Sequence, residues 1–557
     1  RVPRSALAEV AERGGRPGAL DLLEAQATTR LPDLVPVRYG RMAESPFAYL
    51  RGSAVVMAAD LGASADSGLG VQLCGDAHVA NFGTYGSPER NLVFDLNDFD
   101  ESHPGPFEWD VKRLLASLEV VARTLDVGRR RRREIVMGAA RAYREAVRDF
   151  AGQTALAVWY ARIDLGDLVD TVPQDERMVR RARTALDKAR RRDHLQAAAR
   201  LTRVEGDERR FVADPPLVST LEDVLPADAA PVFRRGIADL LVDYRASLAP
   251  DRRRLAERYR VVDIARKVVG VGSVGTRAFV VLLQGVDSDD VLVLQAKEAQ
   301  ASVLEPHVGR GGYAQQGQRV VEGQRLMQAV SDVMLGWQRS AGPDGVARDY
   351  YVRQLRDWKG GLDLTGARPA GLEVYGRLCA WTLARAHARS GDAIAIGAYL
   401  GGSSAADEAL ADFAATYADR TEADHAELEE AVDDGRLPVV RGVWGRSGPV
   451  PHGASGGDLV GVATPGLVSK SDTSPEGACD EGSPCGAGAP RHRAPRRPGR
   501  HRPARSRRHR PRRARPGRAR ARRRPADLGG DDRRRPRVRP RRRHVRRQPR
   551  HRPGAAA

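Results

Sequence analysis

The first part of the chain alternates between short apolar runs and polar loops that contain glycine. Two runs, GLGVQLC at 68–74 and RNLVFDLNDFD at 90–100, have the length and the loop-bounded character of strands. The segment 110–125 spaces its apolar residues three and four apart, which predicts an amphipathic helix. Residues 130–260 are rich in charge and mostly helical in pattern. We therefore expect a helical region with one strand–loop–strand unit inside it.

The pattern changes at residue 261, where runs rich in valine and leucine are joined by glycines. Such runs are typical of an antiparallel sheet. Further elements are expected in chain order: a helix at 318–337, a strand at 350–358, and helices at 372–392 and 409–432. The predicted fold class is α+β. The predicted parts are a helical part with the candidate catalytic loop at 1–260, a β-rich lobe at 261–360, closing helices at 361–437, a flexible linker at 438–490 and a disordered tail at 491–557.

The formal net charge of +20 is concentrated at the C-terminal end. Residues 491–557 hold 30 arginines, no lysine and three acidic residues, a local charge of +27 that leaves −7 for residues 1–490. This composition cannot bury a core. It could neutralise the phosphates of nucleic acid, but arginine without lysine also fits out-of-frame translation of a GC-rich gene, the interpretation that we favour. We expect no nucleic-acid partner except through this tail.

The cysteines and the hydropathy pattern bear on the compartment. The four cysteines are scattered and show neither a disulfide framework nor a zinc-binding spacing. No apolar stretch has the length of a signal peptide or of a bilayer span. We therefore expect a reduced, cytoplasmic protein without a membrane partner.

The segment GVGSVG carries a glycine motif at Gly270, Gly272 and Gly275. A dinucleotide-binding fingerprint needs a helix after the glycines, whereas this motif continues as a strand. A glycine-rich turn between two antiparallel strands is the arrangement that protein kinases lay over nucleotide phosphates. The alternative is a plain hairpin with a flexible turn.

Lys297 lies near the end of the next apolar run, VLVLQAKEA. In a kinase-like lobe such a lysine binds the phosphates of the nucleotide and is held by a glutamate on the following helix. Glu322 is the candidate partner, with Glu298 and Glu305 as competitors. The alternative is a lysine on an edge strand that extends its ammonium into water.

The loop LCGDAHVANFG, residues 73–83, brings together the residue types that phosphoryl transfer uses. An aspartate orients the attacking hydroxyl, and an asparagine a few residues later helps to hold magnesium. Asp76 and Asn81 have that spacing, and the second metal ligand is expected in FDLNDFD, as Asp98 first and Asp95 second. His78 could order the loop through hydrogen bonds without transferring a proton. The alternative is a turn in which these side chains cap the local backbone.

Several strings together resemble a known bacterial family, the domain of unknown function 2252 (DUF2252). They are CGDAHVANFG, FDLNDFDE, GPFEWDVKRLLASL, LQAKEA, RVVEGQRLMQA and ARAHARSGD, and the resemblance covers roughly residues 30–437. His387, in the last string, is expected to be structural. The resemblance identifies a family without naming an activity.

A remoter resemblance implies a chemistry. LCGDAHVANFG resembles the H-G-D-x-H-x-x-N loop of aminoglycoside and choline phosphotransferases, with Cys74 at the position of the leading histidine. LNDFD resembles their metal-binding element, and EWDVKRL resembles a later helix start whose aspartate braces the catalytic loop. The resemblance implies that Asp76 is the catalytic base, that Asn81 and Asp98 bind magnesium, and that Asp110 is structural.

The order of these motifs is the reverse of that in the kinases, where the glycine-rich hairpin and the lysine precede the catalytic loop. The resemblance therefore implies a circularly permuted, two-lobed kinase-like fold, which requires Asp76, Asp98 and Lys297 to meet at one cleft. The expected function is ATP- and magnesium-dependent phosphoryl transfer to the hydroxyl of a small molecule or a protein. The alternatives are a non-catalytic nucleotide-binding regulatory module and a nucleotidyl transferase.

Overall fold

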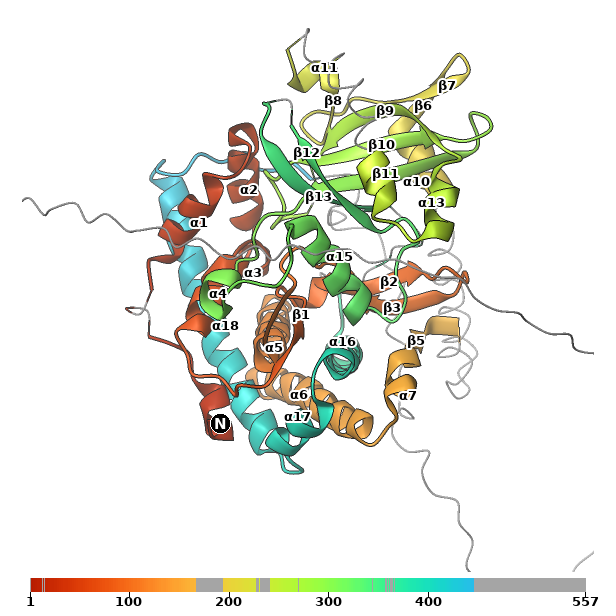
Figure 1. The fold of residues 1–557 in the computed structure, drawn as a ribbon. Helices are drawn as coiled ribbons and strands as arrows, with labels where there is room; N and C mark the ends of the chain where they lie inside the picture. The colour runs from red at the N-terminus through yellow and green to blue at the C-terminus, as the bar shows by residue number, and fades with distance from the viewer. Residues whose placement is uncertain are drawn as a thin grey trace, which may run out of the picture. The chain divides into compact units, whose positions relative to one another are not determined.

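The computed structural model describes residues 2–12, 14, 16–166, 194–226, 230, 241–268, 270–342, 344–355, 358, 360, 364 and 366–444. The chain divides into two compact units, Arg1–Ser471 and Asp472–Ala557, and every described residue belongs to the first. The tail expected at 491–557, and the linker expected at 438–490 beyond residue 444, lie outside the described residues. The described part is a mixed α+β structure, as the sequence predicts (Figure 1).

A six-stranded antiparallel sheet forms the part that is drawn uppermost in Figure 1. The order of its strands is β12-β13-β11-β10-β9-β8. The strands are β8 (Val218–Thr220), β9 (Arg260–Lys267), β10 (Ala278–Gln284), β11 (Val291–Glu298), β12 (Gly336–Ala341) and β13 (Ala347–Gln354). Successive residues of the central strands enter two different apolar clusters, Val280 and Leu282 on one face and Val281 and Leu283 on the other. Both faces of the sheet are therefore covered, which explains the continuous apolar runs in its sequence.

Short elements that precede β9 surround this sheet. They are α10 (His194–Leu201), β6 (Thr202–Glu205), β7 (Glu208–Phe211), α11 (Leu221–Val224) and α13 (Pro250–Ala256). The mostly helical pattern expected for 130–260 is therefore only partly right, because β5 (Ile163–Asp164) and β6 to β8 also lie there. Strands of two to four residues are too short to display a periodicity, and β8 is defined by its pairing with β9.

Two helices, α14 (Glu305–Val308) and α15 (Gln316–Met327), connect β11 to β12. The helix expected at 318–337 ends ten residues early, because Asp332 turns the chain. Its carboxylate accepts hydrogen bonds from the backbone N–H groups of Met334 and Gln354, at 2.8 and 2.5 Å. A side chain that bonds to the nearby backbone in this way competes with helix formation.

Long helices form the part below the sheet in Figure 1. They are α5 (Phe107–Thr124), α6 (Arg129–Ala151), α16 (Pro369–Ser390), α17 (Ala393–Leu400) and α18 (Ala405–Asp433). Helix α5 is buried along almost its whole length, which makes it the centre of this part. The remaining elements of this part are shorter: η1 (Arg4–Ala8), α1 (Ala19–Ala27), η3 (Pro32–Leu34), α2 (Val35–Met42), α3 (Pro46–Gly52), α4 (Ala54–Gly62) and α7 (Ala155–Tyr160).

Two small sheets carry the loops that the sequence analysis singled out. In one, β1 (Gly70–Leu73) pairs with β4 (His103–Pro106), and in the other β3 (Leu92–Leu96) lies between β2 (Phe82–Gly86) and β5. A single turn of 3-10 helix, η4 (Val79–Asn81), leads into β2. Both strands of the expected strand–loop–strand unit are therefore present, as β1 and β3, but they belong to different sheets, and β2, which the sequence analysis placed in the loop, lies between them.

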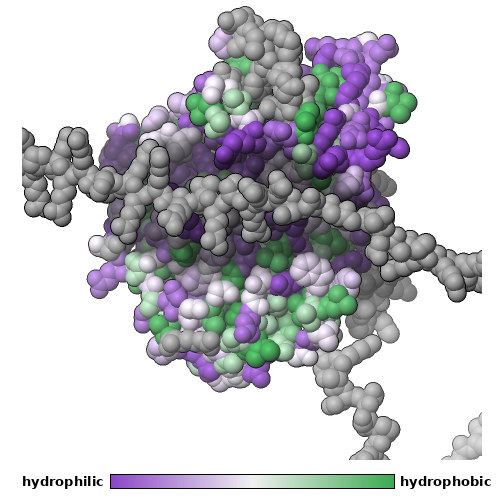
Figure 2. Space-filling view, in the orientation of Figure 1, coloured by the Kyte–Doolittle hydropathy of each residue, from purple (hydrophilic) through white to green (hydrophobic). Residues whose placement is uncertain are grey.

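The surface of this face is mainly hydrophilic across the middle and more apolar over the lower, helical part (Figure 2). Large exposed apolar residues occur on short peripheral elements, such as Leu156, Trp159 and Tyr160 on α7. Among the described helices, none is both long enough and apolar enough to cross a membrane.

Candidate active site

The loop after β1 is held rigidly at its start. Asp110, in the first turn of α5, accepts hydrogen bonds from the backbone N–H groups of Cys74 and Gly75, at 2.8 and 3.0 Å. His387 lies 3.4 Å from the same carboxylate and is fully buried. Gly75 has φ +83°, and a Cβ there would lie 2.2 Å from the carbonyl oxygen of Glu101. Only glycine fits this position. Asp110 holds the start of the loop and His387 lies against Asp110, so both have the structural roles expected of them.

Asp76 is the central polar side chain of the loop. Arg113 donates to its Oδ1 through Nε at 2.8 Å, and the Nη2 atom, which lies 2.7 Å from the same oxygen, donates to the backbone oxygen of Leu50 at 2.6 Å. Nε2 of His78 lies 3.6 Å from Oδ2. The amide of Asn81 donates to the backbone oxygen of Asp76 at 2.8 Å. Burial raises the pKa of Asp76, although Arg113 acts in the opposite direction. Because Arg113 pairs with Oδ1, the Oδ2 atom is the one that an incoming hydroxyl could approach.

His78 is buried beside Asp76, and its Nδ1 atom has no partner among the described residues. Burial, together with the guanidinium groups of Arg51 and Arg113, lowers the pKa of His78 well below its usual value. Its ring meets Phe47 edge to face, with the centroids 6.2 Å apart. The imidazole is therefore neutral near pH 7, which suits an orienting group better than a proton carrier.

Two carboxylates follow β3 in the segment NDFD, and both face the large sheet. The Oδ2 atom of Asp98 lies 4.0 Å from Nζ of Lys297, and Asp100 forms an ion pair with the same ammonium. Tyr351 donates to Oδ1 of Asp100 at 2.5 Å, and Ser273 donates to Oδ2 at 3.0 Å. These contacts join the loop after β3 to three different segments of the sheet lobe.

The charges of this cluster are strongly coupled. Burial and the neighbouring Asp100 carboxylate raise the pKa of Asp98. Burial alone would raise the pKa of Asp100 too, but Lys297 and the Tyr351 hydroxyl outweigh it and hold that pKa well below its usual range. The two carboxylates likewise outweigh the effect of burial on Lys297 and raise the pKa of its ammonium. Lys297 and Asp100 are therefore both charged near pH 7.

Lys297 does not form the ion pair that the sequence predicts. Glu322, on α15, pairs with Arg325 at 3.2 Å instead. The competitor Glu298 pairs with Arg277 at 3.3 Å, and the other, Glu305, lies 3.6 Å from an arginine on its own segment. The carboxylate that holds the lysine comes from the loop after β3, which sequence spacing does not place beside β11.

The glycine motif forms the connection between β9 and β10, as expected. Gly270 and Gly275 have φ values of +64° and +90°, which favour glycine. A Cβ on Gly272 would lie 3.0 Å from the backbone oxygen of Arg51. Between these glycines, Ser273 reaches Asp100, so the connection lies directly over the carboxylate pair.

The sequence analysis assigned no role to two basic residues of this site. Arg113 bonds to Asp76, and Arg51 at the end of α3 lies near Asp76 and Asp98. Burial lowers the pKa of Arg51, whereas the two carboxylates raise it. Its Nε atom is buried and has no partner among the described residues. Sequence reasoning could have found Asp100 from the alternate spacing in NDFD and Arg113 from its place in EWDVKRL, but nothing local identifies Arg51.

Asp95, the second metal candidate, lies away from this cluster. It forms an ion pair with Arg385, and both side chains are 1% exposed. Its other oxygen accepts from the backbone N–H of Ala329 at 2.9 Å. Within the described ranges, no group of three or more His, Cys, Asp or Glu side chains has the arrangement of a metal site. The carboxylates that remain accessible are Asp98 and Asp100, whose side chains are 31% and 27% exposed.

Comparison with known proteins gives a family and no further relatives. The model of a family described as "Uncharacterized protein conserved in bacteria (DUF2252)" matches residues 30–431. No curated protein and no solved structure matches this chain. The match includes the loop of Asp76, the carboxylate pair and Lys297, so the residues of the candidate site lie inside the family's own region. The chain belongs to the DUF2252 family.

Proposed function

We propose that this protein is an ATP- and magnesium-dependent phosphotransferase that acts on a hydroxyl group. The observation that carries the proposal is the ion pair between Lys297 and Asp100, with Asp98 beside it, formed by segments almost two hundred residues apart. A cation aimed at phosphates, carboxylates for magnesium and a nearby aspartate are the groups that phosphoryl transfer requires. The acceptor is a small molecule or a protein.

The order of elements in the sheet lobe supports a kinase-like fold. A glycine-rich connection joins β9 and β10, the next strand β11 carries Lys297, and helices α14 and α15 follow. Protein kinases have this order of glycine loop, lysine strand and helix. The Asp76 loop precedes the lobe in this chain, so we propose a circular permutation, which packing permits when the joined ends are close.

The donor atoms suit the proposed ligands. Magnesium prefers hard oxygen ligands and keeps several waters, so Asp98, Asp100 and the amide oxygen of Asn81 would hold it together with phosphate oxygens. The ammonium of Lys297 would bind phosphate, and the backbone around Ser273 would cover it. Bound magnesium-ATP would supply the phosphoryl group and neutralise its charge.

The protein's own groups would then position the acceptor. Asp76, fixed through Oδ1 by Arg113, would accept a hydrogen bond at Oδ2 from the attacking hydroxyl. Arg51 would add positive charge next to both carboxylates. Most of the rate acceleration would come from positioning and from charge stabilisation.

Nucleotide binding and turnover test the proposal separately. We expect ATP with magnesium to raise the melting temperature of the full chain, and Lys297→Met and Asp98→Asn to abolish most of that rise. Lys112→Met is the matched control, since it removes a buried lysine that contacts Phe413 instead of the site. Equal ATP stabilisation of wild type and Lys297→Met would overturn the proposed site.

Turnover is measured with ATP labelled at the γ-phosphate and a panel of sugars, amino alcohols, aminoglycosides and proteins. We expect Asp76→Asn to lower transfer by about 100-fold or more while ATP binding stays close to wild type. The hydrogen bonds from Arg113 to Asp76 also fit a non-catalytic nucleotide-binding module, and binding without transfer to any acceptor would favour that alternative. Transfer of an α-phosphate label would indicate nucleotidyl transfer.

A further inference from the structure

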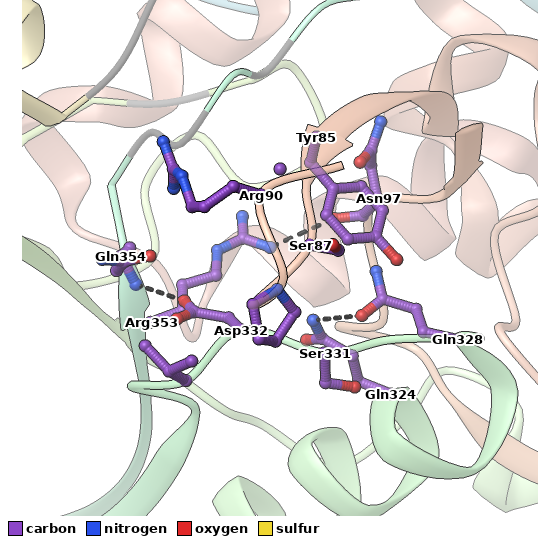
Figure 3. Close-up of a pocket in the computed structure, with 13 residues that line it drawn as sticks. Tyr85, Ser87, Arg90, Asn97, Gln324, Gln328, Ser331, Asp332, Arg353 and Gln354 are labelled. Atoms are coloured by element: carbon purple, nitrogen blue, oxygen red, sulfur yellow. Dashed lines mark hydrogen bonds between the residues drawn. The ribbon is translucent and has the colours of Figure 1, made fainter. Parts of the chain in front are cut away.

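One arginine of the candidate active site has no acceptor for its hydrogen-bond donors. Arg51, in the last turn of α3, donates no hydrogen bond and forms no ion pair within the described part of the chain. Its neighbours are committed: Arg113 pairs with Asp76, and Arg353, on the wall of the cavity in Figure 3, donates to the backbone oxygen of Asn97. A guanidinium group carries five N–H donors, so Arg51 keeps its capacity to bind an anion.

The guanidinium group of Arg51 is held in place without being enclosed. Its Cζ atom lies 5.9 Å from the centroid of the Phe47 ring, one turn earlier on the same helix. Nε is buried, but the residue as a whole is partly exposed, so the two terminal NH₂ groups are the ones that a ligand can reach. An arginine that already lies over an aromatic ring loses less freedom when it binds.

The surroundings of Arg51 place it between the loop of Asp76 and the glycine connection. The Phe47 ring meets that of His78 edge to face at 6.2 Å, and Nε2 of His78 lies 3.6 Å from Oδ2 of Asp76. A Cβ on Gly272 would lie 3.0 Å from the backbone oxygen of Arg51. The residue therefore contacts the centre of the β9–β10 connection, and its ring partner contacts the histidine beside the acceptor aspartate.

The charges near Arg51 belong to the two ends of the proposed transfer. Burial lowers the pKa of Arg51, and the carboxylates that oppose this effect are Asp76 and Asp98. Asp76 is the group proposed to receive the acceptor hydroxyl, and Asp98, 4.0 Å from Nζ of Lys297, is a proposed metal ligand. A phosphoryl group that passes between them carries its negative charge on three equatorial oxygens, which an arginine can stabilise.

We propose that Arg51 binds the phosphoryl group during its transfer, an inference that rests on the proposed function. The bond that breaks joins the γ-phosphorus to the oxygen shared with ADP, and ADP leaves with the electron pair. The acceptor oxygen forms the new bond to phosphorus, and its proton goes to Oδ2 of Asp76. The terminal NH₂ groups of Arg51 donate to the equatorial oxygens. Arg51 is thus a catalytic residue, whereas Lys297 binds the nucleotide before and after transfer.

The test separates binding of the nucleotide from binding of the transferring group. MgADP is titrated calorimetrically into the full chain with and without aluminium fluoride, which imitates the phosphoryl group in flight beside ADP. We expect aluminium fluoride to tighten MgADP binding about 100-fold in wild type and less than about tenfold in Arg51→Gln. MgADP alone should bind equally to both. Arg51→Lys, which keeps the charge but loses the paired donors, should show an intermediate tightening.

Arg389→Gln is the matched control. Arg389 also ends a helix, α16, has a buried Nε without a partner in the described ranges, and lies over an aromatic ring, that of Trp159 at 3.8 Å. Since Trp159 belongs to α7, away from the site, this variant should bind MgADP with and without aluminium fluoride as wild type does.

The outcomes distinguish the role of Arg51 from the proposed function. Failure of wild type to bind MgADP overturns the proposed function, and the role of Arg51 with it. Normal MgADP binding with equal tightening in wild type and Arg51→Gln, or with no tightening in wild type, overturns the role of Arg51 alone. So does loss of MgADP binding in an Arg51→Gln variant that circular dichroism shows to be folded. If that variant does not fold, the comparison of wild type with Arg51→Lys decides in the same way.

Discussion

The ion pair between Lys297 and Asp100 is the contact whose removal tests the candidate site most directly. Lys297→Met removes the ammonium and keeps a side chain of similar length in β11. Asp100→Asn removes only the charge from the loop after β3. The lysine side chain is 3% exposed and that of the aspartate 27%, so water shields the pair poorly. Each single variant therefore leaves a charge whose partner is gone.

The structure gives the size of the effect. Breaking a buried ion pair by removing one partner costs about 3–5 kcal/mol. In Lys297→Met, Asp100 keeps the hydrogen bonds from Tyr351 and Ser273, so we expect a loss of about 2–4 kcal/mol in the free energy of unfolding. In Asp100→Asn, the ammonium keeps only Asp98 at 4.0 Å, so a similar loss is expected. The double variant should be about 2 kcal/mol more stable than the sum of the two losses implies.

The assay is urea unfolding of wild type, both single variants and the double variant at pH 7, followed by tryptophan fluorescence. The same cycle on Arg130 and Glu134 is the control, because their side chains are 95% and 45% exposed and such pairs couple by less than about 1 kcal/mol. A coupling below about 0.5 kcal/mol between Lys297 and Asp100 would refute the buried pair and the argument that it joins two distant segments.

Lowering the pH gives an independent check on the coupling between Lys297 and Asp100. The pKa of Asp100 is held well below its usual range, so the native carboxylate stays ionised at pH values where the unfolded one takes up a proton. Its stabilisation is complete above the unfolded pKa of about 4 and is lost as the pH falls below that value. The coupling energy should therefore be smaller at pH 3 than at pH 7, and an increase would contradict the assignment.

Three further substitutions test neighbouring features by urea unfolding. Gly75→Ala should cost about 2–5 kcal/mol, because the new Cβ lies 2.2 Å from the backbone oxygen of Glu101, whereas Gly68→Ala, with φ +66° and open space, should cost only about 1 kcal/mol. Lys112→Met should remove the fall in stability of about 3 kcal/mol that wild type shows from pH 10.5 down to 8, because burial lowers the native pKa of Lys112 to about 8 while the unfolded lysine gains its proton earlier. Asp95→Asn should lower the free energy of unfolding by about 3–5 kcal/mol, because Arg385 would stay buried without its counter-charge. An unchanged free energy of unfolding would show that the ion pair is not structural.

The sequence predicts the local elements well and their long-range partners poorly. The hairpin with Gly270 and Gly275 is confirmed, because it depends on neighbouring residues. The strands expected at 68–74 and 90–100 are present, but the sequence analysis missed β2 between them and the pairing of β1 with β4. The helix expected at 318–337 is too long, since the turn that ends it depends on a hydrogen bond between Asp332 and Gln354, twenty-two residues away. A local apolar pattern carries no information about that contact.

The same limit explains why the sequence predicts the wrong partner for Lys297. A glutamate on the following helix is the local choice, yet Asp100 reaches Lys297 from 197 residues earlier in the chain. Asp95 and Asp98 look equivalent in FDLNDFD, but strand alternation and the turn after β3 direct Asp95 toward a buried arginine and Asp98 toward the lysine. Which carboxylate meets which cation is decided by the packing of β3 against α16 and by the approach of the loop after β3 to the large sheet.

Different side chains hold the centre and the ends of the connection between β9 and β10. Its backbone oxygens at Gly270 and Val274 accept hydrogen bonds from Arg41 and Arg30, so the segment before α3 holds both ends of the loop. The centre is held by Ser273 on Asp100. Under the proposed function, a phosphate that binds Lys297 would compete with Asp100 for the ammonium, which would weaken the contact between Ser273 and Asp100 and leave those of Arg30 and Arg41 intact.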